Sequence, residues 1–351
     1  MNKTNSREIS FDIIKIIATF LVLFYHLEII DMGYVQGEYY RASINYIITG
    51  VCAMSVPLFF MVHGALLLRK KYSIKVIMGR MIKLLTLLVI WSVIIFSSTQ
   101  GILVSGYYVS FFKLIVSGSD YTTHLWFLRT MLILTLLLPI LYKVYTYKYK
   151  ILLQGIIIIL LLCPFTYNLI ILFANRFGWE YFSKYSITGV FTMYSVLYFL
   201  VGKIMYDSFK RNKVNGVLNK YVLPLLATIT GWTFIIYESV TWTNLIGDLH
   251  DNVNSCFPTM GALLLAVGVF RLILNINISN KRLVNIIKTI SDNILGVYLL
   301  HYPITILVEE YLDSEVPLMI SLIIAILIFI SIILVTMLIR KIPHVRKLME
   351  I

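Results

Sequence analysis

Apolar runs of about 20 residues follow one another along nearly the whole chain, and this limits the possible folds more than any other feature. A helix needs about 20 apolar residues to cross a hydrocarbon core of about 30 Å. No alternating barrel pattern is present, and a span in lipid must satisfy its own backbone hydrogen bonds, so every span is expected to be a helix. The ten predicted spans are 10–30, 44–68, 84–104, 124–145, 151–172, 188–208, 221–241, 255–275, 289–311 and 316–339.

Composition excludes a water-soluble fold. Charged residues make up 13% of the chain, against about 25% in soluble proteins, and the mean hydropathy is +0.86. No long polar, Pro-rich or Gly/Ser-rich stretch separates two domains, and no internal repeat is found. The sequence therefore predicts an all-α polytopic membrane protein with about ten transmembrane helices, in which residues 1–351 form one membrane domain without a separate soluble domain.

The net charge of +13 is explained by orientation in the membrane. With the N-terminus inside, 24 of the 30 Lys and Arg residues fall in inner segments and five in or beside outer ones. Such a bias predicts that both termini are cytoplasmic, with His124 and Trp242 near the outer surface. We expect contact with the lipid bilayer and none with nucleic acid.

The ends and the cysteines add little. The first apolar run contains Asp12 and Lys15, and no small-residue cleavage site follows it, so it is expected to remain as a helix rather than be removed as a signal peptide. The three cysteines all lie within predicted spans and do not form a metal-ligand pattern. The outer segment 105–123, rich in Gly, Ser and aromatic residues, is a candidate lid.

Ionisable residues inside spans are the informative ones, because each is costly in lipid unless it is paired or faces a polar cavity. The first span holds Asp12, Lys15 and His26. Asp12 and Lys15 are three positions apart and can form an ion pair. Lys15 and His26 are eleven positions apart, which returns to the same helix face with a separation of ~16 Å along the axis.

Two readings of this face remain open. Asp12 and Lys15 can be a salt bridge at the helix entrance, with the lysine reaching to the interface, and His26 can be a hydrogen-bonded interfacial residue. The alternative is a functional face, which we favour because all three ionisable groups share it.

Other spans carry further candidates. His63 and Gly64 lie in the second span, where the glycine suggests close helix contact and the histidine can be simply interfacial. Arg80 and Lys83 stand at the inner mouth of the third span, where two cations suit a phosphate group or plain anchoring in the membrane.

The fourth and ninth spans complete the set. The fourth opens with His124, Trp126 and Arg129, of which an aromatic belt explains only the tryptophan. The ninth contains His301 near mid-membrane, followed by Pro303, which frees a backbone carbonyl. A structural histidine is the alternative at position 301.

These motifs in this order resemble acyltransferase family 3, whose members move acyl groups, most often acetyl, onto sugars of envelope glycans or antibiotics. The first-helix pattern of a cation, ten residues and a histidine is matched by Lys15 and His26. Further matches, in chain order, are Pro57-Leu-Phe-Phe with Gly64, the pair Arg80 and Lys83 leading to Trp91, His124-Leu-Trp-Phe-Leu, Tyr198-Phe-Leu-Val-Gly202 and Tyr298-Leu-Leu-His-Tyr-Pro303.

Two positions depart from the family pattern. His63 stands where the family commonly has serine, and Lys15 stands where arginine is more usual. A lysine keeps the charge but loses the planar fork of donors, so a bidentate contact at that position is not expected.

The resemblance implies acetyl-CoA or another acyl-CoA as donor, bound from the cytoplasm with help from Arg80 and Lys83, and no metal. It implies His26 as general base on an acceptor hydroxyl, directly or through an acyl-enzyme step, supported by Lys15, Asp12 and His301. His124, Trp126 and Arg129 would face the acceptor. The implied acceptor is a glycan or lipid-linked glycan at the plasma membrane of a bacterium, with envelope biosynthesis proteins as partners.

Two other functions remain possible at this point. A secondary transporter or flippase of sugar precursors would use the same intramembrane charges as a proton or substrate path, although the lack of repeats counts against it. A non-catalytic envelope scaffold would tolerate replacement of His26 by alanine.

Overall fold

The computed structural model describes residues 7–27, 29–100, 124–147, 193–211, 216–312 and 316–343, together with 151, 155, 170 and 346. Every regular element within these ranges is helical. The elements are α1 (Ile9–Tyr25), α2 (Ile44–Thr49), α3 (Ser55–Leu67), α4 (Ile74–Gln100), α6 (Trp126–Thr146), α8 (Met193–Arg211), α9 (Leu223–Ile246), the 3-10 turn η6 (Asn254–Cys256), α10 (Met260–Leu274), α11 (Lys281–Asp292), α12 (Ile294–Tyr311) and α13 (Leu318–Ile339).

The predicted spans correspond to these helices with shifted ends. The predicted span 44–68 is α2 and α3 joined through a 3-10 segment at Gly50–Met54, and α9 follows a π-helical turn at Leu218–Val222. Most of the predicted span 289–311 is α12, and the chain bends by 55° near its start, where the amphipathic helix α11 meets α12. The candidate lid at 105–123 and, apart from residues 151, 155 and 170, the predicted span 151–172 lie outside the described residues.

Five helical stretches are long and apolar enough to cross a membrane, or six if the bent pair of α11 and α12 counts as one span. These counts refer to the described part of the chain. The prediction of an all-helical, membrane-capable protein is therefore confirmed, whereas the count of about ten spans and the cytoplasmic termini stay predictions.

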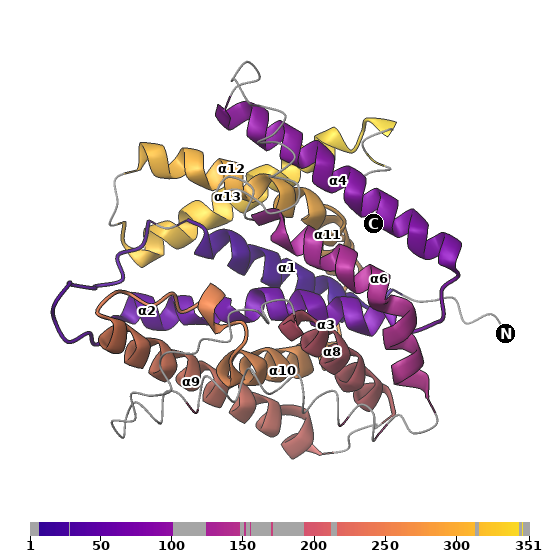
Figure 1. Cartoon of the computed structure of the whole chain (residues 1–351), viewed down its shortest axis with the longest axis horizontal. Coiled ribbons are helices and arrows are strands. Elements are labelled where there is room, and N and C mark those ends of the chain that lie inside the picture. The colour runs from indigo at the N-terminus through magenta and orange to yellow at the C-terminus, as the bar shows by residue number, and fades with distance from the viewer. Residues whose placement is uncertain are drawn as a thin grey trace.

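Helix α1 lies at the centre of the molecule beside α3 (Figure 1). Helices α8, α9 and α10 cover one side of this pair, and α11, α12 and α13 cover the other (Figure 1). We name the end with Arg7, Arg80 and Arg340 the inner end, and the end with His26 and Asp251 the outer end, following the predicted topology.

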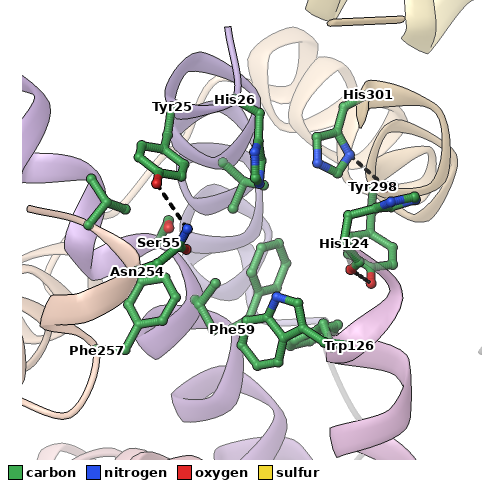
Figure 2. Close-up of a pocket in the computed structure, with 14 residues that line it drawn as sticks. Tyr25, His26, Ser55, Phe59, His124, Trp126, Asn254, Phe257, Tyr298 and His301 are labelled. Carbon is green, nitrogen blue, oxygen red and sulfur yellow. Dashed lines mark hydrogen bonds between the residues drawn. The ribbon is translucent and has the colours of Figure 1, made fainter. Parts of the chain in front are cut away.

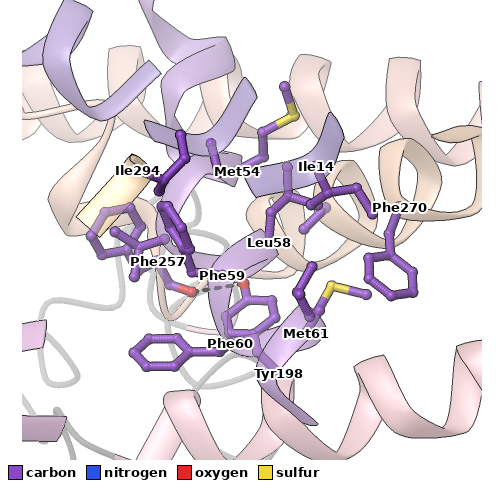
Figure 3. Packing of buried hydrophobic residues seen from close by; sticks show 14 of the residues in the cluster. Ile14, Met54, Leu58, Phe59, Phe60, Met61, Tyr198, Phe257, Phe270 and Ile294 are labelled. Atoms are coloured by element: carbon purple, nitrogen blue, oxygen red, sulfur yellow. Dashed lines mark hydrogen bonds between the residues drawn. The ribbon is translucent and has the colours of Figure 1, made fainter. Parts of the chain in front are cut away.

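Glycines set the closest helix contact. A methyl group at Gly64 of α3 would lie 1.7 Å from the carbonyl oxygen of Phe199, and one at Gly202 of α8 would lie 2.1 Å from that of Met61. The close approach predicted at Gly64 is thus confirmed. Around it, large side chains such as Phe60 and Tyr198 are fully buried, and the Tyr198 hydroxyl donates a hydrogen bond to the Phe257 carbonyl at 2.9 Å (Figure 3).

Candidate functional site

Three histidines from three helices meet around a small cavity at the outer end. We call this cavity, which holds about 30 Å³, the histidine chamber. Figure 2 shows His26, His124 and His301 around it, with Tyr25 and Asn254 forming part of the opposite wall. These histidines are 98 or more positions apart in the sequence. The fold brings them together from the end of α1, the turn before α6, and α12.

His26 follows the last residue of α1, and its backbone N–H still bonds to the carbonyl of Val22 at 3.1 Å. Its ring centroid lies 5.4 Å from that of His301 and 5.5 Å from that of Tyr302. The ring is only partly buried. The His26 ring therefore lines the chamber and keeps some access to the outside.

The tautomer of His301 follows from its partner. Its Nδ1 lies 2.6 Å from the carbonyl oxygen of Tyr298, and a carbonyl can only accept, so Nδ1 carries the hydrogen. Nε2 then keeps its lone pair. That atom is buried and has no hydrogen-bond partner within the described ranges, which makes it able to accept a proton or a hydrogen bond in the chamber.

His124 completes the trio. Its ring stacks on Tyr302 with centroids 4.8 Å apart and lies 5.7 Å from His301. The Tyr298 hydroxyl holds its backbone by donating to the His124 carbonyl at 2.5 Å. Neither ring nitrogen has a hydrogen-bond partner among the described residues, and buried polar atoms of this kind are rare unless a ligand or water completes them.

The outer wall of the chamber is hydrogen-bonded, and its side chains are neutral except for the nearby carboxylate of Asp251. The Tyr25 hydroxyl donates to Asp251 Oδ2 at 2.8 Å and accepts from Asn254 Nδ2 at 2.9 Å (Figure 2). Backbone N–H groups of Val253 and Asn254 donate to Asp251 Oδ1 at 2.8 and 3.1 Å. Asp251 is thus occupied in holding the loop to α1.

A larger cavity of about 490 Å³, which we call the inner cavity, opens at the other end. Its wall carries the cationic side chains of Lys15, Arg80 and Arg340, together with His63. Phe59, Phe127 and Tyr298 line both cavities. Three aromatic side chains therefore form the partition between a cationic cavity and the histidine chamber.

Arg80 and Lys83 were predicted as a pair, but only Arg80 lines the inner cavity. The Arg80 guanidinium lies over the Tyr72 ring at 4.3 Å, lines the inner cavity and has a buried Nη1 without a partner among the described residues. Lys83 is exposed. The residues that line the inner cavity include Arg80 but not Lys83.

Asp12 and Lys15 lie at the inner end of α1, about 21 Å and about 16 Å along the helix from His26. Their predicted ion pair is present, with Lys15 Nζ 3.0 Å from Asp12 Oδ1. Asp12 is 2% exposed and also accepts from Arg7 Nε at 2.6 Å and from Ser291 Oγ at 2.6 Å. The structure thus ties Asp12 to α11 and does not bring it to the histidines.

Trp126 lines the histidine chamber, whereas the residues that line the two cavities do not include Arg129. Tyr298 and Tyr302 were noted in the sequence within a motif but were given no role; they flank His301 on one face of α12 at a spacing of four residues. That spacing was a usable signal, because residues four apart are neighbours on a helix. Arg340 was taken only as a positive-inside residue, and nothing in its local sequence separates it from the other cations at the inner end.

Among the described residues, the His, Cys, Asp and Glu side chains form no group of three or more that could hold a metal ion. The site is instead a set of proton acceptors at one end of an aromatic partition and a set of cations at the other. Such an arrangement suits an enzyme that removes a proton from one substrate while holding an anionic one.

The described helices form a membrane-capable bundle, and a family comparison gives the class of protein to which it belongs. A family model for an acyltransferase domain, that of acyltransferase family 3, matches residues 8–341, and the chain belongs to this family. It is therefore an acyltransferase that transfers groups other than aminoacyl groups. No curated protein and no solved structure matches the chain.

Proposed function

We propose that this enzyme moves an acyl group, in the first instance acetyl, from a cytoplasmic acyl-CoA to a hydroxyl of an envelope glycan in the plasma membrane of a bacterium. The observation that carries the proposal is the shared wall of Phe59, Phe127 and Tyr298. A donor held in the inner cavity and an acceptor in the histidine chamber would meet across this wall. Membership of an acyltransferase family favours this function over the transporter.

The inner cavity suits the donor. Its volume of about 490 Å³ falls in the range of small-molecule sites, roughly 300 to 1,000 Å³. Lys15, Arg80 and Arg340 supply positive charge, and guanidinium groups in particular form strong hydrogen bonds with phosphate. The phosphates of the acyl-CoA would remain among these cations while the thioester end reaches the aromatic partition.

The histidine chamber suits the transfer itself. His26 would remove the proton of the acceptor hydroxyl, whose oxygen attacks the thioester carbon. A C–O bond forms, the C–S bond breaks, and the proton passes to the thiolate that leaves. His301, with its lone pair on Nε2, would orient the His26 ring and share the proton, and the free ring nitrogens of His124 would bind the acceptor.

The test is acyl transfer by the purified enzyme in proteoliposomes, with labelled acetyl-CoA and envelope glycan extract as acceptor. We expect label to enter the glycan fraction, and the glycan mass to increase by one acyl group. Cells with and without the gene should show the same mass difference in their envelope glycans. Labelled glycan that appears equally with inactivated protein would contradict the proposal.

A further inference from the structure

A buried carboxylate in α9 has no role in the transfer just described. Glu238 is 2% exposed, and neither of its carboxylate oxygens has a hydrogen-bond partner among the described residues. The Thr259 hydroxyl lies beside the carboxylate. A buried acid with so little hydrogen bonding is costly, so a ligand that brings its own donors would relieve the cost.

Glu238 faces a second outer cavity of about 280 Å³, which we call the Glu238 cavity. Trp242, one helical turn further along α9, lines it, and the ring of His250 stacks on the indole at 6.2 Å with an interplanar angle of 27°. Burial lowers the pKa of His250, although Asp251 opposes the change. The cavity therefore offers a flat, uncharged aromatic surface beside one acid.

The Glu238 cavity lies directly behind the histidine chamber. The segment from Asn254 to Phe257, which includes η6, separates the two. Asn254 and Phe257 line the histidine chamber, whereas Ser255 and Cys256 line the Glu238 cavity. A substrate that reaches the histidines from the outer end therefore passes close to this second cavity.

We propose that the Glu238 cavity binds a sugar ring of the acceptor, with Glu238 accepting hydrogen bonds from ring hydroxyls and Trp242 packing on the apolar face of the ring. The proposal rests on the proposed function, because it names the part of the acceptor that is held while a hydroxyl reacts next to His26. Two carboxylate oxygens match two neighbouring hydroxyl donors. A flat aromatic side chain with a polar neighbour suits a ring that is apolar on one face and polar at its edge.

The experiment measures sugar binding without turnover. Methyl glycosides of glucose, galactose, mannose, rhamnose and N-acetylglucosamine are added singly to the purified protein in nanodiscs, and saturation-transfer NMR reports binding. We expect at least one glycoside to bind wild type, and Glu238→Gln and Trp242→Ala to weaken that binding by about 10-fold or more. The amide replaces one of the two acceptor oxygens by a donor, and the alanine removes the aromatic packing. Glu38→Gln, the same change at an exposed position of the outer end, should bind as wild type does.

Two assays separate this proposal from the proposed function. The glycoside assay contains no acyl-CoA, so it reports on the Glu238 cavity whether or not acyl transfer occurs. The transfer assay in proteoliposomes reports separately on the proposed function. Glycoside binding by a protein that transfers no acyl group would refute the proposed function and leave the Glu238 cavity as a sugar site. The proposal would be overturned if no glycoside binds wild type, or if Glu238→Gln binds the glycoside as wild type does.

Discussion

The two ends of the bundle are held together by different chemistry. At the inner end, ion pairs fasten the start of α1, with Arg7 bound to Asp12 at 2.6 Å and to Asp292 at 2.7 Å, and Lys210 bound to Glu8 at 2.8 Å. At the outer end, aromatic donors bind backbone carbonyls at 2.6 to 2.8 Å. These bonds are Tyr34 to Gly247, Tyr40 to Met32, Tyr46 to His250 and Trp232 to Ile47.

The difference between ion pairs at one end and aromatic hydrogen bonds at the other matches the different charge of the two cavities. Under the proposed function, a charged donor would lie beside the cations of the inner cavity, and carboxylates such as Asp12 and Asp292 hold neighbouring cations in position. The ring nitrogens of the histidine chamber would exchange a proton, and strong charges nearby would fix their protonation state. Apart from the bonds to the Asp251 carboxylate, neutral hydrogen bonds from tyrosine and tryptophan side chains hold the outer loops without that effect.

The largest expected effect is at the outer end. His26→Ala and His26→Gln should both lower the rate of acyl transfer by roughly 10²- to 10⁴-fold, because a general base contributes that much and glutamine keeps the hydrogen bonding without the proton chemistry. The measurement is acyl-CoA-dependent modification of the acceptor by purified variants. Each variant must match wild type in monodispersity and melting temperature.

Near-normal turnover by His26→Gln would show that His26 is not the base. His301, whose Nε2 has no hydrogen-bond partner in the described part of the chain, would then take that role, and His301→Gln would become the inactive variant.

The inner end should respond in binding rather than in rate. Arg80→Ala should raise the KM for acyl-CoA by roughly 10- to 100-fold, the equivalent of one lost charge-assisted hydrogen bond, with a much smaller effect on kcat. Lys83→Ala is the matched control, because Lys83 is exposed and does not line the inner cavity. Steady-state kinetics over a range of acyl-CoA concentrations separates the two constants. Equal effects of the two variants would mean that the pair acts through membrane topology instead.

The partition itself should have a smaller effect. Phe59→Leu leaves a space between the cavities where the ring now packs against Phe127 with centroids 5.6 Å apart. Water would then reach the thioester more easily, so acyl-CoA hydrolysis without acceptor should rise several-fold while transfer falls. The free thiol released in the two reactions can be followed optically. A variant with unchanged hydrolysis would indicate that the two cavities do not communicate through Phe59.

The smallest expected effect concerns acid stability at the inner end. Burial opposes ionisation of Glu8, but hydrogen bonds from Lys210 and Tyr206 hold its pKa below the ordinary value. Its stabilising contribution is therefore complete above the ordinary carboxyl pKa and is lost as the pH falls through the lower folded value. The contribution should be below about 1 kcal/mol, because Lys210 is half exposed. Melting temperatures of wild type and Glu8→Gln should converge on acidification, and a constant difference would contradict this.

The sequence predicts the local features of the fold well. The spacing of Asp12 and Lys15 predicts their ion pair, and Gly64 predicts the close contact of α3 with α8. The bend at Asn293 was not predicted, because the amphipathic helix α11 carries enough apolar residues to read as the start of a span.

The candidate site was predictable in its members but not in its geometry. His26, His124 and His301 each stand out as ionisable residues in apolar runs, yet only the packing of three distant helices brings them together. Lys15 and His26 share one helix face, but this did not reveal that the two side chains line different cavities. Glu238 was overlooked although it is an acid inside the predicted span 221–241, which is itself a signal.

The central claim is that donor and acceptor are used from opposite ends of one bundle. It is tested most directly in sealed proteoliposomes in which a C-terminal tag identifies the inner end. Acyl-CoA added outside vesicles with the inner end outward should acylate a membrane-impermeant glycan trapped inside, and His26→Gln vesicles should not do so. Acylation that occurs only when donor and glycan are on the same side would contradict the account.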